Sequence, residues 1–313
     1  MKAEKIGIKV IRTIDRIVNY ALLVLIVALL AFAGYALWDS KQIYKAADKS
    51  SYEVYKPGQE DEGKNFMELQ AINPEVIAWL DVYGTNIDYP VTQAEDNSKY
   101  VNTGAEGRYS LSGAIFLDAD NSRDFSDFNS IIYGHHMDKS VMFGPIGDFT
   151  DEDVFYSHRY GSLFFDEKYQ GLEFFAFIHA DAYDRSVFTP NVGKEKREKY
   201  LTNLTETAIH RSNVEITESD RIVLLATCSS DSTNGRDVLV GKITDELVKD
   251  PFKGAHDGQK IHSAPATHGH VAELFLWPLL LALVLTIRII TLISRYRKRR
   301  ISLSTQEAVR KTI

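Results

Sequence analysis

The chain carries a long apolar run near each end. The first, residues 17–38, is uncharged from residue 21 onward and is long enough to cross a bilayer as a helix. A cleaved signal peptide is the alternative, because Ala31-Phe32-Ala33 has the small-residue pattern of a cleavage site. The second run, residues 272–294, predicts another spanning helix, and an amphipathic helix on the membrane surface is the alternative there.

Between these runs, short stretches of β-branched and aromatic residues alternate with turns rich in Gly, Asn and Asp. Many short strands separated by turns predict a closed or nearly closed β-barrel. Residues 151–156 and 194–210 instead have helical spacing. We therefore expect a mainly β fold, a closed barrel with added helices, flanked by two transmembrane helices. The expected strands are residues 76–82, 86–91, 114–118, 130–133, 172–178, 221–228 and 237–243.

Polar stretches separate the barrel region from the apolar runs. Residues 39–65 contain Pro57-Gly58 and an acidic cluster, and residues 249–271 contain further Gly and Pro, so both are expected to be stalks. The expected organisation is an N-terminal segment (1–16), a span (17–38), a stalk (39–65), a globular domain (66–248), a stalk (249–271), a span (272–294) and a basic tail (295–313).

Charge predicts how this arrangement lies across the membrane. Residues 1–16 carry a net +3 and residues 288–313 a net +7, which leaves −17 for residues 17–287 of a chain whose total is −7. Basic flanks of spanning helices stay in the cytoplasm, so both termini are expected there and the globular domain outside. An acidic domain repels nucleic acid, which excludes that class of partner.

The only cysteine of the chain, Cys228, ends the strand expected over residues 221–228. Arg236 starts the next strand after a polar turn, so a thiol and a cation are expected at the facing ends of two adjacent strands. A nearby cation favours the thiolate form of a cysteine. A buried structural cysteine is the alternative. Catalysis is a reason for a domain outside the cell to keep an exposed thiol.

Two consecutive histidines, His135 and His136, follow Gly134 at the end of another expected strand. This position suits a general acid or base at the rim of an active site. Strand alternation allows only one of the two to face Cys228. We expect surface or structural roles for His158, His179 and His210, and the histidines of residues 256–270 lack the spacing of a fixed metal site. No nucleotide or redox motif is present, so we expect no cofactor, and we assign no metal ligands.

The order and spacing of these motifs resemble the sortase family, the membrane-anchored cysteine transpeptidases of Gram-positive bacteria. The resemblance covers about residues 66–245 and implies a sortase-type closed β-barrel. The family motifs are Leu224-Leu225-Ala226-Thr227-Cys228, Tyr133-Gly134-His135, and Arg236 ahead of Asp237-Val238-Leu239-Val240. Class B is indicated by Asn73-Pro74 before Trp79, Asn86-Ile87-Asp88-Tyr89-Pro90-Val91, Asp96-Asn97-Ser98-Lys99-Tyr100, Gly113-Ala114-Ile115-Phe116-Leu117-Asp118, Met142-Phe143-Gly144, and the helix expected near residues 194–210.

The resemblance implies a role for each matched residue. Cys228 is the nucleophile, His135 the general acid and base, and Arg236 the cation that binds substrate and stabilises the oxyanion. The Gly-His pattern of the family selects His135 over His136, which is expected to be solvated. The positions that match the family's substrate groove are Tyr133, Asn97 and Thr227.

The implied reaction cleaves a Thr-containing C-terminal sorting signal through a cysteine acyl-enzyme. The protein bearing the signal is then transferred to an amine of a peptidoglycan precursor or to a pilin lysine. The alternatives are a cysteine protease that uses water as acceptor and a membrane scaffold without catalysis. The second span departs from class B and resembles the class C pilin polymerases. Their Asp-Pro-aromatic motif precedes the barrel, however, whereas Asp250-Pro251-Phe252 follows it.

Overall fold

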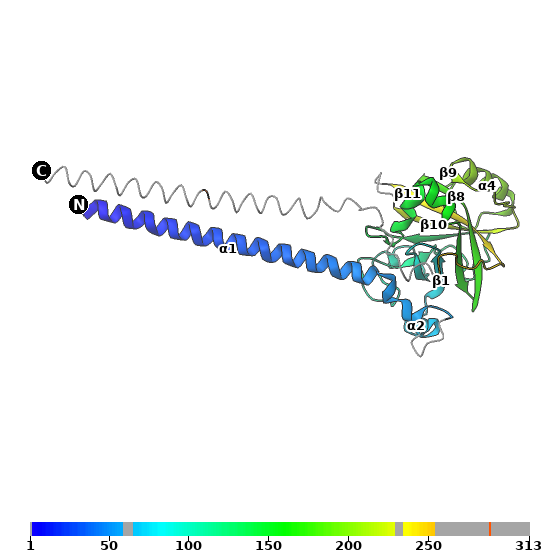
Figure 1. Cartoon of the computed structure of the whole chain (residues 1–313), viewed down its shortest axis with the longest axis horizontal. Coiled ribbons are helices and arrows are strands. Elements are labelled where there is room, and N and C mark those ends of the chain that lie inside the picture. The colour runs from blue at the N-terminus through cyan, green and yellow to red at the C-terminus, as the bar shows by residue number, and fades with distance from the viewer. Residues whose placement is uncertain (1, 59–64, 229–233, 254–287, 289–313) are drawn as a thin grey trace. The chain divides into compact units, whose positions relative to one another are not determined.

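A long helix opens the structure, a computed structural model that describes residues 2–58, 65–228, 234–253 and 288. This helix, α1 (Lys2–Ala47), is continuous (Figure 1), and its apolar part is rich in the good helix formers Ala and Leu. Its stretch Val10–Ala47 is long and apolar enough to cross a membrane, and its most apolar part is not buried within the described protein. The second predicted span, residues 272–294, lies outside the described residues except for Arg288.

Eight of the nine strands in the main sheet close into a barrel (Figure 1). The order is β11–β10–β4–β3–β2–β1–β7–β8, and a further pairing of β11 with β8 closes the ring. Neighbours are antiparallel except for β10 with β4 and β2 with β3. These strands are β1 (Val76–Val82), β2 (Asp88–Thr92), β3 (Ile115–Leu117), β4 (Asn129–Gly134), β7 (Tyr160–Phe165), β8 (Lys168–Asp181), β10 (Arg221–Cys228) and β11 (Gly235–Thr244).

The remaining elements decorate the barrel. Strand β9 (Ala208–Arg211) pairs with residues 176–178 of β8, and β5 (His136–Met137) forms a hairpin with β6 (Val141–Met142). The helices are α2 (Phe66–Ile72), α3 (Glu152–Ser157) and α4 (Arg197–Glu206). The 3-10 turns are η1 (Lys49–Ser51), η2 (Glu53–Tyr55), η3 (Lys99–Val101), η4 (Gly144–Thr150) and η5 (Lys194–Lys196).

Side-chain alternation along the strands divides the buried residues into two layers. On β10, Val223 and Leu225 belong to the cluster that fills the barrel. The residues between them, Leu224 and Ala226, belong to a second cluster, which includes Tyr200 and Leu204 of α4. The outer wall of the barrel is therefore covered by the α4 segment, and alternate positions of β10 face these two different layers.

The predicted barrel is confirmed, and each expected strand coincides with an observed one within a few residues. The expected helix over residues 194–210 is wrong at its end, because α4 stops at Glu206 and β9 follows. Residues 208–211 extend instead because they pair with Ala176, Phe177 and Ile178 of β8. This long-range partner overrides the local helical spacing.

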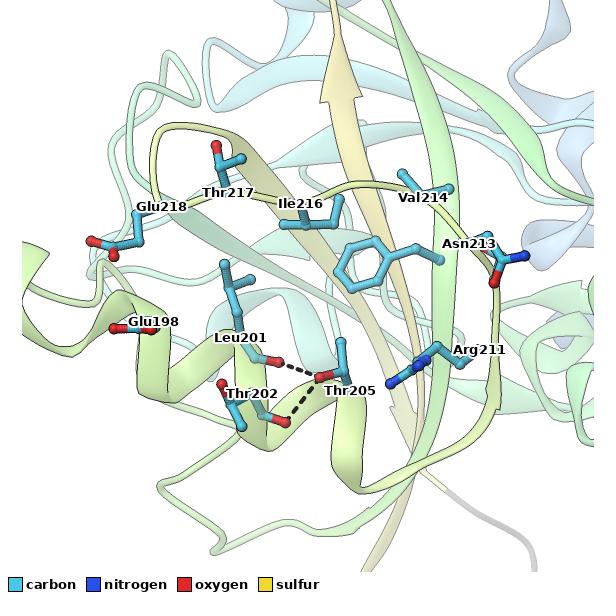
Figure 2. A pocket seen from close by; sticks show the side chains of 12 residues that line it. Glu198, Leu201, Thr202, Thr205, Arg211, Asn213, Val214, Ile216, Thr217 and Glu218 are labelled. Carbon is cyan, nitrogen blue, oxygen red and sulfur yellow. Dashed lines mark hydrogen bonds between the residues drawn. The ribbon is translucent and has the colours of Figure 1, made fainter.

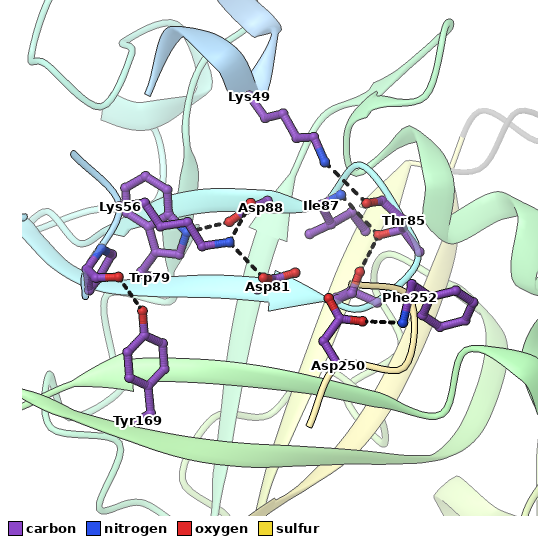
Figure 3. Close-up of polar contacts among 12 residues, drawn as sticks. Lys49, Lys56, Trp79, Asp81, Thr85, Ile87, Asp88, Tyr169, Asp250 and Phe252 are labelled. Atoms are coloured by element: carbon purple, nitrogen blue, oxygen red, sulfur yellow. Dashed lines mark hydrogen bonds and ion pairs between the residues drawn. The ribbon is translucent and has the colours of Figure 1, made fainter. Parts of the chain in front are cut away.

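Parts of both segments predicted as stalks pack onto the barrel. In the first, Tyr55 is buried, and Lys56 forms ion pairs with Asp81 (2.8 Å) and Asp88 (2.6 Å) on the β1–β2 hairpin (Figure 3). In the second, the ring of Phe252 stacks on His158 with centroids 4.9 Å apart. The folded body therefore includes residues on either side of the predicted domain 66–248.

Candidate active site

The ends of β4, β10 and β11 meet at one end of the barrel. Thr227 of β10 pairs with Gly134 of β4 in parallel register, so the residues that follow them, Cys228 and His135, leave adjacent strands at the same level. Cys228 is also the Cα partner of Arg236 across the antiparallel β10–β11 pair. We call this place, defined by His135, Cys228 and Arg236, the β4–β10–β11 edge.

The local sequence explains why β10 is a buried strand and why β4 ends at Gly134. Residues 222–226 of β10 are all apolar and fully buried, as expected for a strand with a core on both faces. Gly134 ends β4 where a Cβ atom would come within 2.7 Å of the Phe143 ring. Only glycine at position 134, directly before His135, leaves room for the Phe143 ring to pack against the backbone there.

The imidazole of His135 is half-buried and anchored by one nitrogen. Its Nε2 lies 2.8 Å from the backbone oxygen of Val101, next to the loop between β2 and β3. A carbonyl oxygen only accepts hydrogen bonds, so Nε2 carries the hydrogen in this contact. The neutral ring would then have its free lone pair at Nδ1, the nitrogen able to accept a proton.

Arg236 provides a positive charge at the same edge. Its Nη1 donates to the backbone oxygen of Gly235 at 3.0 Å, and the guanidinium has no ion pair within the described part of the chain. Its charge also acts on the Tyr133 hydroxyl. A guanidinium has five N–H donors, so Arg236 retains donors for an anion or a developing oxyanion.

Tyr133 and Asn97 are brought together by a third residue, Asp118. The Tyr133 hydroxyl and the Asn97 amide both donate to Asp118 Oδ2 at 3.0 Å. Burial and the Asp118 charge hold the pKa of Tyr133 well above its usual value, so this phenol stays protonated and donates. Asp118 had no predicted role, although its place at the end of a buried strand is a signal that could have identified it.

Thr227, the third predicted groove residue, lies differently. Strand alternation puts it on the same face as Val223 and Leu225, toward the barrel interior, and it is 1% exposed. Its hydroxyl oxygen is buried and has no hydrogen-bond partner among the described residues. The structure thus joins Tyr133 and Asn97 but leaves Thr227 on the opposite, buried face of β10.

The other histidines differ in whether their ring nitrogens have hydrogen-bond partners. The Nδ1 of His136, expected to be solvated, is buried and has no hydrogen-bond partner among the residues that the structure describes. His210 Nε2 contacts the Thr150 oxygen at 2.7 Å, and His158 Nδ1 contacts the Val154 oxygen at 3.0 Å. No cluster of metal-binding side chains occurs within the described chain, and residues 256–270 lie outside it.

A pocket of about 620 Å³ lies between α4 and the segment that follows β9 (Figure 2). Leu201 and Thr205 line it from α4, and Val214 and Ile216 line it from the facing segment. None of the predicted site residues lines this pocket. This pocket is therefore separate from the β4–β10–β11 edge.

Comparison with known proteins gives strong matches, although no protein-family model matches the chain. The chain is 32% identical over 178 residues to Sortase B of Listeria monocytogenes, which covers 56% of this chain and 72% of that protein. It is 46% identical to the crystal structure of sortase B from the type II pilus of Streptococcus pneumoniae, with a TM-score of 0.52, covering 58% of this chain and 100% of that one. A Staphylococcus aureus sortase B–substrate complex is 26% identical, with a TM-score of 0.54 and coverage of 66% and 94%.

Proposed function

Because the chain belongs to the sortase class B family, we propose that it is a membrane-anchored cysteine transpeptidase whose active site is the β4–β10–β11 edge. The observation that carries this proposal is the strand register. It brings the backbone of Cys228 next to Arg236, and the end of β10 next to the strand that precedes His135. A nucleophile, a general acid and base, and a cation within one edge are the groups that acyl transfer requires.

In the proposed reaction, the Cys228 thiolate attacks the carbonyl carbon of a threonine in a C-terminal sorting signal. Arg236 donates hydrogen bonds to the oxygen that becomes negative. The peptide bond breaks as imidazolium His135 protonates the leaving amine, and a thioester remains on Cys228. Neutral His135 then accepts a proton from an incoming amine, which attacks the thioester, forms a new amide bond and breaks the C–S bond, so that the Cys228 thiolate and the His135 imidazolium are both restored.

The hydrogen bonds of Tyr133 and Asn97 to Asp118 support a role for these two residues in the substrate groove. Because its Oδ2 accepts a hydrogen bond from each of these two residues, the Asp118 carboxylate holds both side chains in defined positions. A preorganised polar wall favours one peptide conformation at little cost in entropy. We include Thr227 through its backbone only, since its side chain lies on the buried face.

The proposed location is the cell membrane, with both termini in the cytoplasm and the barrel outside. The apolar part of helix α1 and the lysines and arginines that precede it within the helix support an N-terminal anchor, and residues 272–294 are the proposed second span. The partners proposed are surface proteins that bear the sorting signal and an amine acceptor. The pneumococcal relative is a pilus sortase, which favours testing a pilin lysine beside a peptidoglycan amine.

Product analysis tests the proposal. Full-length protein in detergent is incubated with a library of Thr-containing signal peptides, with and without a lysine-containing peptide or an oligoglycine amine. The proposal expects an amide product that contains the added amine, formed by the wild type and absent with Cys228→Ala. Product formed only with water would support the protease instead, and peptide binding without any product would support the scaffold.

A further inference from the structure

A polar group lies at the end of the barrel interior, on the opposite face of β11 from the one that faces α4. Asp237 follows Arg236 and is 7% exposed. Alternation along β11 places it on the inner side, because Leu239 fills the barrel and Val238 packs on the outer wall. A carboxylate buried this deeply requires compensating partners, since an isolated charge in such a place is strongly unfavourable.

One partner of Asp237 comes from β8. Oδ1 of Asp237 lies 3.0 Å from Nδ1 of His179, its register partner across the β8–β11 pair. His179 keeps 38% of its side chain exposed, so the contact lies at the rim of the barrel. This contact fixes the β11 end of the β4–β10–β11 edge against β8.

The second carboxylate oxygen lies next to η4, which closes this end of the barrel. A Cβ atom built on Gly147 would be 3.6 Å from Asp237 Oδ2, 3.6 Å from His136 Cε1 and 4.0 Å from His136 Nδ1. Asp237 and His136 therefore border the same point. His136 Nδ1 is the buried nitrogen without a hydrogen-bond partner among the described residues.

A second carboxylate also lies near His136. The Asp148 carboxylate of η4 interacts electrostatically with His136 and with His158, so the carboxylates of Asp148 and Asp237 both lie near His136. His136 also directly follows His135 in the chain. Its position therefore restricts the backbone that carries the proposed general acid and base.

We propose that Asp237 is a positioning residue for the reaction: bound to His179 and lying beside His136 at Gly147, it fixes Arg236 and the His135 backbone relative to Cys228. This inference rests on the roles of the proposed active site. Asp237 does not touch the reacting atoms. It acts by holding Arg236 where its charge favours the Cys228 thiolate.

The single cysteine makes a direct test possible, because alkylation by iodoacetamide then reports on Cys228 alone. The rate as a function of pH gives the pKa of the thiol in the full-length protein, without any substrate. Two opposite effects of Asp237→Asn can be separated by sign. Loss of a nearby negative charge by itself lowers the thiol pKa, whereas displacement of Arg236 raises it.

The proposal expects Asp237→Asn to raise the thiol pKa by about one unit, and so to slow alkylation at neutral pH by about tenfold. His136→Gln is expected to act in the same direction, and the double variant to be no slower than the slower single variant, because the two side chains act as a unit. Asp220→Asn is the matched control, since Asp220 pairs with Lys242 at 2.9 Å near the other end of the β10–β11 pair. It should leave the rate unchanged.

A thiol pKa that falls or stays constant in Asp237→Asn would overturn the proposal. It would also be overturned if the double variant slowed alkylation by the product of the factors measured for Asp237→Asn and His136→Gln alone. Misfolding is recognised separately, because an unfolded chain gives the rate and pKa of a free cysteine and loses the near-ultraviolet circular dichroism of the barrel. Since no substrate is used, a failure here is distinct from the absence of transpeptidation in the wild type.

Discussion

Replacing Lys56 with methionine removes the cation that joins the segment after α1 to the barrel. Lys56 Nζ contacts Asp81 at 2.8 Å and Asp88 at 2.6 Å, and the three side chains are only 15–20% exposed. Burial lowers the pKa of Lys56, but the two carboxylates outweigh it and hold that pKa above its ordinary 10.5. Without the lysine, Asp81 and Asp88 face each other uncompensated.

The structure allows the cost to be estimated. Breaking a fully buried ion pair costs about 3–5 kcal/mol, and the residual exposure of this cluster reduces that to about 2–3 kcal/mol. For a domain of this size, the loss corresponds to a melting temperature lower by about 5–10 °C. Lys99→Met is the control, because Lys99 and Glu75 form an ion pair with side chains 45% and 30% exposed. Its expected cost is below about 1 kcal/mol.

The pH dependence has a definite sign. Burial and the neighbouring Asp88 raise the pKa of Asp81 above its ordinary 3.8 even with Lys56 present, and removing Lys56 raises it further. A carboxyl group with a raised folded-state pKa destabilises the fold increasingly as the pH rises through the ordinary value. The deficit of Lys56→Met relative to the wild type should therefore shrink between neutral pH and pH 4. In the wild type, the stability contributed by Lys56 is full below pH 10.5 and declines above it, as the pH approaches the raised pKa of the folded state.

Thermal unfolding of the full-length protein, followed by near-ultraviolet circular dichroism from pH 4 to 8, measures both effects. A Lys56→Met variant that melts within about 2 °C of the wild type, with the same pH dependence, would refute the reasoning.

Three further substitutions test the structure. Tyr133→Phe removes the hydrogen bond to Asp118 and should cost about 1 kcal/mol in unfolding experiments, with a raised KM in peptide transfer; an unchanged KM contradicts the groove assignment. Gly144→Ala places a Cβ atom against the backbone oxygen of Met137 and should lower the unfolding free energy by more than about 2 kcal/mol. Gly147→Ala in the same turn meets only ordinary contacts and should change it by less than about 1 kcal/mol, so equal losses would contradict the packing described.

The barrel and the proposed site could be predicted from the sequence because both depend on short apolar runs and on the residues that end them. The apolar run of residues 222–226 ends at Cys228, and its parallel and antiparallel neighbours were each recognisable as strands. Strand β9 was missed because its extended form depends on pairing with β8, which lies about thirty residues away. No local pattern in residues 208–211 indicated that they would pair with a strand of the barrel.

The clusters of polar side chains could not be predicted from local sequence patterns either. Asp81, Asp88 and Lys56 are ordinary charged residues in sequence, and only the β1–β2 register and the path of the chain after α1 bring them together. The same holds for His136 and Asp237, which η4 brings to a common point. The sequence of two consecutive histidines carries no sign of which ring has a buried, unpartnered nitrogen.

Mass spectrometry of an acyl-enzyme tests the central claim most directly. The full-length protein is mixed with a Thr-containing signal peptide in the absence of amine, and the peptide that contains Cys228 is analysed for a thioester adduct. The account predicts an adduct on Cys228 that added amine converts to an amide product, and no adduct in Cys228→Ala. An amide product formed equally well by Cys228→Ala, or an adduct that only water resolves, would contradict the account.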